Sequence, residues 1–332
     1  MKLIVAHRER LVREALRRSL ARGRFELMAQ AGDLESLKNE CRKQSPQLLL
    51  VELELLGDKA GELPELLRCG TPVIALAATS AVSGGYEAMG LGALGLIEPP
   101  ALGDDGELIG AQNLLSRMEK LVGIVPERPQ ERKPRATAAA PATQVPILAI
   151  GASTGGPLAL ARVLGELPAG FEASVLIVQH IEGEFSDGLA EWLAGQCRLP
   201  VSLARRGGSP EPGRIHVAGP GGHLVLTPSF HFGLQQGQPG ELHVPSINAL
   251  FRSLAQHAAP GAAAILTGMG SDGAAGMGEL QRRGWYTVAQ DEDSSVVYGM
   301  PRAAVELGAA RQSLALNAIG PALVRHFRRR GP

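Results

Sequence analysis

The stretch VPILAIGASTGG, residues Val145–Gly156, places an apolar run directly before a glycine-rich turn. A continuous apolar run of this kind is typical of a strand that is buried on both faces of a parallel sheet. The residues that follow, PLALARVLGEL, have helical periodicity. The sequence therefore predicts a strand, a tight turn and a helix in succession, which is the repeating unit of an α/β fold.

Three kinds of site use a glycine-rich turn between a strand and a helix. A dinucleotide-binding loop needs G-x-G-x-x-G, but Ser153 stands where the second glycine belongs. A P-loop needs a lysine after its last glycine, but Pro157 and Leu158 follow Gly156. The pattern G-x-S-x-G does match Gly151–Gly155, and it raises a serine hydroxyl above the sheet edge. The alternative is that Ser153 only caps the following helix.

Two further polar side chains follow predicted buried strands. His180 ends the run SVLIVQH, and Asp272 lies in MGSDGAAG, which follows AAAILTG. Because ligand sites of parallel sheets lie at the carboxyl ends of the strands, Ser153, His180 and Asp272 are expected to lie close together. A serine nucleophile needs a base, and the base needs an acidic partner to orient it. Considered singly, His180 is more often a structural residue and Asp272 can be a helix cap.

Residues 125–145, rich in proline, alanine and charge, interrupt the pattern and are predicted to form a flexible linker. The linker separates residues 1–124 from residues 146–332, and each part is predicted to hold its own parallel sheet. The predicted strands are KLIVA, FELMAQ, LLLVEL, PVIALAA and LGLIEP in the first part, and PILAIG, SVLIVQH, AAAILTG and WYTVAQ in the second. Helices are predicted between these runs, the last of the first part being ELIGAQNLLSRMEKLV. The stretch 214–244, rich in glycine and proline, predicts short strands and hairpins.

Composition disfavours several classes of function. Lysine and arginine together number 33, as do aspartate and glutamate, and this zero formal charge argues against a general nucleic-acid-binding protein. Three scattered cysteines, Cys41, Cys69 and Cys197, argue against a disulfide framework. The sequence shows neither a signal-peptide pattern nor an apolar run of about 18 residues, which predicts a cytoplasmic protein without membrane insertion.

Metal and cofactor chemistry are not predicted either. The cysteines form no CxxC pair, and the histidines of the second part have no metal-ligand spacing. The four that could suggest a metal site are His216, His223, His231 and His243. The acidic stretch DEDSS, residues 291–295, could coordinate a cation, but a solvated loop is the simpler interpretation.

Several separated motifs carry a resemblance to a known family. GASTGGP, VQH, LTGMGSDGAAGM and AQDEDSSVVYGMPRAAVELG occur in this order, together with GPGGHL and HVPSINALFRSLA. On these motifs, most of residues 146–320 resembles the catalytic domain of the chemotaxis protein-glutamate methylesterases, the CheB family. The resemblance implies a doubly wound parallel sheet that hydrolyses glutamate γ-methyl esters on the cytoplasmic domain of chemoreceptors, often with glutamine deamidation and without a cofactor.

The resemblance also assigns roles to individual residues. It implies that Ser153 is the nucleophile, His180 the general base and Asp272 its orienting acid. It further implies that the backbone N–H groups of Thr154 and Met269 stabilise the oxyanion. The chain departs from the family where VPSIN, residues 244–248, replaces the common R-P-S-V-D. That departure concerns receptor recognition or local packing and leaves the triad intact.

The first part resembles a response-regulator receiver, a flavodoxin-like sheet, in its βα count and in the runs PQLLLVE and GALGLIEPP. A phosphorylatable receiver has an acidic pair after its first strand, which binds Mg²⁺, and an acceptor Asp after its third. It has a Ser or Thr after its fourth strand and a Lys after its fifth. The corresponding positions here hold Ala6 and His7, Glu52, Ala77 and Pro99. The comparison implies a degenerate receiver that is not phosphorylated.

Other assignments in the first part remain open alternatives. Thr79 lies close to the hydroxyl position, and Asp33 and Asp58 are interpreted as a helix cap and a loop residue. The receiver could inhibit the enzyme, dock a chemosensory kinase or other signalling partner, or serve packing alone. A degenerate receiver suggests a specialised chemosensory system, such as one that controls pili. A receptor-docking scaffold with incidental hydrolysis is the alternative function, and a nucleotide-binding module is disfavoured.

Overall fold

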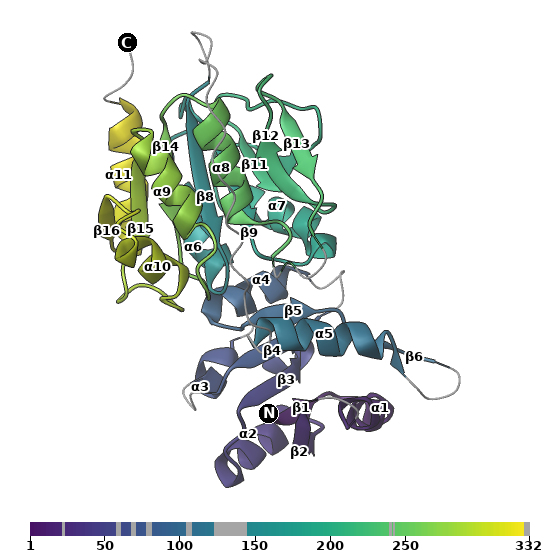
Figure 1. The fold of residues 1–332 in the computed structure, drawn as a ribbon. Coiled ribbons are helices and arrows are strands. Elements are labelled where there is room, and N and C mark those ends of the chain that lie inside the picture. The colour runs from purple at the N-terminus through teal and green to yellow at the C-terminus, as the bar shows by residue number, and fades with distance from the viewer. Residues whose placement is uncertain are drawn as a thin grey trace. The chain divides into compact units, whose positions relative to one another are not determined.

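Figure 1 shows the computed structural model, which describes residues 1–21, 24–57, 61–67, 71–77, 82–103, 108–122, 145–238, 241 and 243–328. The chain divides into two compact units, Met1–Arg128 and Pro129–Pro332. The predicted linker, residues 125–145, lies outside the described residues except for Val145, and its flexibility stays a prediction. Within the described ranges, no helix combines the length and apolar character needed to cross a membrane.

The N-terminal unit is built on a parallel sheet with strand order β2-β1-β3-β4-β5. Its strands are β1 (Lys2–Ala6), β2 (Glu26–Ala31), β3 (Leu48–Glu52), β4 (Val73–Leu76) and β5 (Gly95–Ile97). Its helices are α1 (Arg10–Leu20), η1 (Leu53–Leu56), α2 (Leu34–Lys43), α3 (Leu63–Leu67), α4 (Val82–Leu91) and α5 (Ala111–Leu121). This strand order is the flavodoxin-like one, so the predicted fold class of this unit is confirmed.

The sequence prediction differs from the structure at the start of α5. Leu108–Ile109 was expected to be helical, but it forms β7, which pairs in antiparallel register with β6 (Ala101–Leu102). Gly110 follows with a φ of 84°, a conformation that favours glycine and lets the chain turn into α5. A two-residue strand is too short to produce a periodic sequence pattern, which explains why the expected helix began too early.

The interpretation of Asp33 as a helix cap is confirmed. Its side chain accepts a hydrogen bond from the backbone N–H of Ser36 at 2.7 Å, at the start of α2. This bond is the main reason why the pKa of Asp33 is lowered. Asp58 and Thr79, the other two open assignments, lie outside the described residues.

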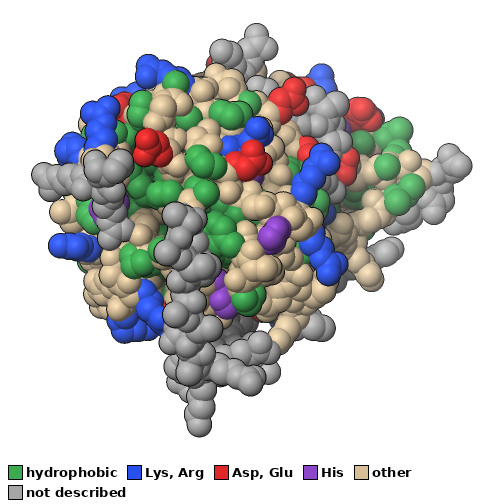
Figure 2. Space-filling view, turned by 90° about the horizontal axis from the view of Figure 1, so that it is seen from above, with side chains coloured by type: hydrophobic (Ala, Val, Ile, Leu, Met, Phe, Trp, Pro, Cys, Tyr) green, Lys and Arg blue, Asp and Glu red, His purple; other side chains and the backbone are tan. Residues whose placement is uncertain are grey.

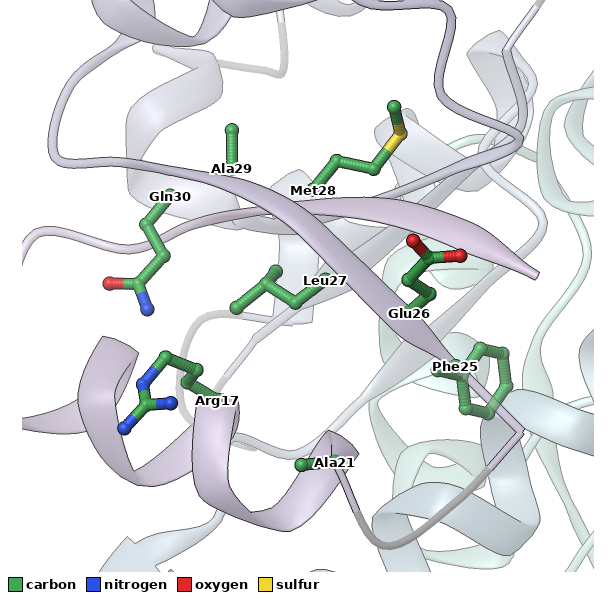
Figure 3. A pocket seen from close by; sticks show the side chains of 8 residues that line it. All are labelled: Arg17, Ala21, Phe25, Glu26, Leu27, Met28, Ala29 and Gln30. Atoms are coloured by element: carbon green, nitrogen blue, oxygen red, sulfur yellow. The ribbon is translucent and has the colours of Figure 1, made fainter.

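A surface pocket of about 510 Å³ lies between α1 and the edge strand β2 (Figure 3). Arg17 and Ala21 line it from the helix side, and residues 25–30 line it from the strand side. None of the predicted site residues lines this pocket.

The C-terminal unit is a doubly wound parallel sheet with strand order β10-β11-β9-β8-β14-β15-β16. Its strands are β8 (Ile147–Ala152), β9 (Ser174–Gln179), β10 (Val201–Ala204), β11 (Ile215–Ala218), β14 (Ala262–Ile265), β15 (Tyr286–Gln290) and β16 (Gln312–Leu314). A separate antiparallel hairpin consists of β12 (His223–Leu226) and β13 (Phe232–Gln235). The doubly wound sheet predicted for this part is confirmed.

Helices cover both faces of this sheet (Figure 1). One group packs together as α8 (Ile247–His257), α9 (Ala274–Arg282) and α10 (Met300–Glu306). The other group is α6 (Gly156–Gly165), α7 (Ser186–Ala194), the short η4 (Gly183–Phe185) and α11 (Leu316–Arg328). Because both faces are covered, the central strands β8, β9 and β14 are buried along their whole length.

The edge strands are where the sequence prediction falls short. Neither β10 nor β16 was predicted, and only one of their seven residues is buried. The stretch 214–244 does contain the predicted hairpin, but its first strand, β11, joins the main sheet in parallel register instead. On the face that Figure 2 shows, basic and acidic side chains are interspersed, in keeping with the zero formal charge.

Candidate active site

The ends of three adjacent strands meet at the position predicted for the site. Ser153 directly follows β8 and His180 directly follows β9, and these strands pair with Ala152 opposite Gln179. The backbone N–H of His180 donates to Ala152 O at 3.0 Å. Since β8 lies between β9 and β14, the chain winds outward in both directions from this point. Such a switch in strand order is where open parallel sheets bind ligands.

The turn after β8 is held by glycines. The N-cap of α6 is Gly155, in the left-handed conformation with φ of 78°, and no side chain caps the helix. Ser153 is therefore not the helix cap that the sequence left as an alternative. A Cβ added to Gly268 would lie 2.6 Å from the Cβ of Ser153, so only glycine fits beneath the serine. The backbone N–H of Ser153 is fixed in turn by Thr267 O at 3.0 Å.

His180 and Asp272 form a direct pair. Nε2 of His180 lies 2.8 Å from Oδ2 of Asp272, and the two side chains are 8% and 7% exposed. An ionised carboxylate only accepts hydrogen bonds, so Nε2 carries the ring proton and Nδ1 keeps its lone pair. Among the described residues, the buried Nδ1 has no hydrogen-bond partner. The free basic nitrogen of His180 is therefore Nδ1.

Asp272 is surrounded by hydrogen-bond donors. They are His180 Nε2 (2.8 Å), Ile247 N (2.7 Å), Ser246 Oγ (3.0 Å), Asn248 N (3.0 Å) and Gly273 N (2.9 Å). Burial opposes the charged form of Asp272, but the interactions with His180 and the backbone N–H groups outweigh it and hold the pKa well below its usual range. The N-cap of α9 is Gly273, and the first-turn N–H of Gly276 donates to Asn248 Oδ1 at 2.7 Å rather than to Asp272, so Asp272 is not a simple cap.

Gln179 links Ser153 and His180. Its side chain is buried, and Nε2 donates to Ser153 O at 2.9 Å and to His180 O at 3.1 Å. Gly156 makes room for it, because a Cβ at that position would collide with the amide of Gln179. Sequence reasoning missed Gln179, although a polar residue at the end of an apolar strand was a visible signal.

The predicted oxyanion donors flank the serine. Thr154 follows Ser153 directly and is 3% exposed, and its carbonyl accepts from Thr267 Oγ1 at 2.9 Å. Met269 follows Gly268, whose carbonyl accepts from Met300 N at 2.8 Å. In the part of the chain that the structure describes, no hydrogen bond engages the Met269 N–H.

The histidines and the acidic loop form no metal site within the described residues. His216 is buried in β11, and burial lowers its pKa to about 4. Asp291 Oδ1 accepts from the backbone N–H and the hydroxyl of Ser294, at 3.1 and 2.6 Å, which closes the DEDSS loop on itself. His223 and His243, in contrast, lie at the site, a placement that sequence spacing alone did not reveal.

The receiver positions are occupied by an ion pair. Glu52 ends β3, and its carboxylate accepts from Arg8 N at 2.7 Å, Arg8 Nη2 at 3.0 Å and Arg8 Nε at 3.1 Å. Burial raises the pKa of Glu52, but the hydrogen bonds from Arg8 outweigh it, so the net shift is downward. His7 Nδ1 lies 3.7 Å from the same carboxylate. The side chains that face Glu52 are thus those of His7 and Arg8, whereas Ala6 is buried in β1.

Comparisons with known proteins agree with the geometry. A family model described as CheB methylesterase matches residues 148–323. A curated protein-glutamate methylesterase/protein-glutamine glutaminase from Cupriavidus metallidurans is 37% identical over 98% of each chain. One from Bordetella avium is 37% identical over 98% of this chain and 97% of its own. The crystal structure of the Thermotoga maritima CheB methylesterase catalytic domain covers 55% of this chain and 99% of its own, with 30% identity and a TM-score of 0.53.

Proposed function

Since this chain belongs to the CheB methylesterase family, we propose that Ser153, His180 and Asp272 carry out its ester hydrolysis. The enzyme is a protein-glutamate methylesterase, which hydrolyses the γ-methyl esters of glutamate side chains. We propose that it also releases ammonia from glutamine side chains, because its curated relatives carry both names. Its substrate is then the methylated cytoplasmic domain of a chemoreceptor, and the protein acts in the cytoplasm.

The acylation half of the reaction uses Nδ1 of His180. Ser153 Oγ attacks the ester carbonyl while Nδ1 takes the hydroxyl proton, and Asp272 stabilises the resulting imidazolium through Nε2. The backbone N–H groups of Thr154 and Met269 bind the oxyanion, where one such donor is worth about 2.7–4 kcal/mol. Nδ1 then returns the proton to the departing methanol, which leaves an acyl-enzyme on Ser153.

The deacylation half reverses these roles with water. His180 takes a proton from the attacking water, the second tetrahedral intermediate forms in the same oxyanion site, and Ser153 leaves as the proton returns to Oγ. The glutamate carboxylate and methanol are the products. This sequence requires no metal or cofactor, because each proton moves between water, Ser153 and His180.

One observation carries this proposal. The Nδ1 atom of His180 is buried without a partner while Nε2 is bound to Asp272, at the strand end next to Ser153. A buried unpaired acceptor is costly to a fold and is usually retained for chemistry. A purely docking scaffold would have no use for a basic nitrogen kept free in this way.

Methanol release from methylated receptor tests the proposal. We expect wild type to release methanol and a folded Ser153→Ala variant to lose on the order of 10⁴-fold or more in kcat. If the protein is only a docking scaffold, wild type and Ser153→Ala will both bind receptor and neither will release methanol. Turnover by Ser153→Ala near the wild-type rate would remove the nucleophile assignment.

We further propose that the N-terminal unit is a receiver that takes no phosphoryl group. The acceptor position holds Glu52, and the guanidinium of Arg8 already neutralises its carboxylate through two hydrogen bonds, while the backbone N–H of Arg8 donates a third. A Mg²⁺ site needs oxygen ligands, but His7 and Arg8 face the carboxylate instead. The receiver surface then acts by docking a chemosensory kinase or another signalling partner.

A further inference from the structure

The orientation of Asp272 depends on where α8 begins. Three of its five donors come from the first residues of that helix: Ser246 Oγ, Ile247 N and Asn248 N. These contacts use both carboxylate oxygens, so they fix the rotation of the carboxylate as well as its place. A shift of the helix start would move the oxygen that holds His180 Nε2.

His223 fixes that helix start. The backbone N–H of Ser246, the N-cap of α8, donates to Nδ1 of His223 at 3.0 Å. His223 begins β12 and is only 2% exposed. The contact therefore joins the β12–β13 hairpin to the residue that contacts Asp272, across 23 positions of the chain.

The same contact sets the protonation of the His223 ring. Because Nδ1 accepts from a backbone N–H, Nε2 carries the proton and donates to Oε2 of Glu241 at 2.8 Å. Glu241 Oε2 also accepts from the backbone N–H of Gln238 at 2.7 Å. His223 is thus held as one neutral tautomer by partners on both sides.

The contacts form one continuous chain. It runs from Glu241 through His223, Ser246 and Asp272 to His180. Each group in this part-buried chain is held by the next, so the contacts together favour a single arrangement of the groups involved. A partner behind a functional group commonly affects activity by about 10–100-fold, as documented for groups that hold metal ligands.

We propose that His223 is a positioning residue for the catalytic pair, acting on Asp272 through the N-cap of α8. This inference rests on the proposed roles of Ser153, His180 and Asp272. Turnover needs Nδ1 of His223 as the acceptor for Ser246 N. The contact of Nε2 with Glu241 keeps the ring proton on Nε2.

Two substitutions of His223 test the contacts of Nδ1 and Nε2 separately. The side-chain oxygen of His223→Asn falls near the position of Nδ1 and can accept from Ser246 N. The amide of His223→Gln reaches the position of Nε2, so it can donate to Glu241 and leaves Ser246 N without its acceptor. For the full-length protein we expect His223→Asn to keep kcat within about threefold, and His223→Gln to lose about 10–100-fold in kcat with little change in KM.

The readout is methanol release from methylated receptor, with thermal melting of each variant and Ser153→Ala as the inactive reference. The inference is supported if His223→Gln loses kcat while His223→Asn keeps it, and the two variants melt at the same temperature. Equal kcat in both variants, whether normal or lowered, overturns it. If Ser153→Ala is itself active, the proposed function fails independently of this comparison.

A spectroscopic measurement on wild type covers the case in which His223→Gln does not fold. Imidazole ¹⁵N NMR of wild type reports directly which ring nitrogen of His223 is protonated. We expect the neutral tautomer with the proton on Nε2, and His223→Asn identifies the signal by its absence. A proton on Nδ1 of His223 would mean that it cannot accept from Ser246 N, which overturns the inference.

Discussion

The ring of His243 lies flat against the ring of His180, with centroids 3.9 Å apart and planes within 2° of each other. The stack covers one face of the base while Asp272 holds its edge at Nε2. Together the two contacts restrict rotation of the His180 ring. They therefore restrict the direction in which Nδ1 presents its lone pair.

His243→Ala is expected to lower kcat by about threefold to tenfold, because an aromatic pair is worth roughly 0.5–1.5 kcal/mol. His243→Phe keeps a flat ring and should retain most of the activity. Steady-state methanol release checks both variants, with kcat separated from KM. Equal loss in the two variants would show that a feature of the imidazole other than its flat ring matters.

Asp272→Asn is expected to lower kcat by about 10⁴-fold, since the orienting charge is lost. The variant should also be less stable by about 1–3 kcal/mol, because an amide NH₂ would face backbone N–H donors that now meet carboxylate oxygen. Denaturant unfolding and methanol release measure the two effects. Asp187→Asn, at an exposed position in the first turn of α7, is the matched control and should change neither.

Gln179→Glu should lower kcat by tenfold or more. The substitution turns the donor that holds Ser153 O and His180 O into an oxygen that repels both carbonyls. Gln281→Glu is the control, because it removes a similar bond, 2.8 Å to Gly308 O, from a part of α9 outside the site. Unchanged turnover in Gln179→Glu, with normal turnover in the control, would show that the two carbonyls need no such link.

His216 should make the fold less stable in acid. Burial lowers its pKa to about 4 from an ordinary value near 6.5. The unfolded chain therefore takes up a proton first, so stability is lost as the pH falls from about 6.5 to about 4. At about pH 5 the loss is on the order of 2 kcal/mol.

Thermal melting of wild type and His216→Gln checks this prediction. The glutamine cannot titrate, so its melting temperature should fall less than that of wild type between about pH 7.5 and pH 5. Parallel curves for the two proteins would show that the acid sensitivity lies in other groups.

Acetyl phosphate with Mg²⁺ should leave the N-terminal unit unmodified and the esterase rate unchanged. Glu52 is a longer acid than the usual acceptor, and Arg8 occupies its oxygens. Intact mass and methanol release, measured on one sample, test both parts, with a phosphorylatable receiver as the positive control. A phosphoryl group on this unit, accompanied by faster turnover, would contradict the proposal.

The site could be predicted where the sequence pattern was long and apolar. The runs at β8, β9 and β14 are buried on both faces, so their order along the chain placed Ser153, His180 and Asp272 at one sheet edge. Only one residue of the edge strands β10 and β16 is buried, and their sequences carry no such signal.

Contacts between distant side chains were beyond the reach of sequence patterns. His223 reaches Ser246 across 23 positions, and Arg8 reaches Glu52 across 44. No periodicity or spacing rule relates residues that far apart. The contact of Arg8 with Glu52 was not predicted either, since the direction of a side chain at a strand end is set by the local turn.

The choice of ring nitrogen in His180 has a further consequence for how this site can be probed. Because Nε2 faces Asp272, the nitrogen that we propose takes the proton of Ser153 is Nδ1, the one bonded to Cγ. Nδ1 therefore lies nearer to the main chain of its own residue than Nε2, which is at the tip of the ring. Methylated histidines tell the two ring positions apart chemically. A methyl group on Nε2 removes the N–H that Asp272 accepts and leaves Nδ1 as a base. A methyl group on Nδ1 removes the base and leaves a lone pair on Nε2, which must be protonated before it can donate to Asp272.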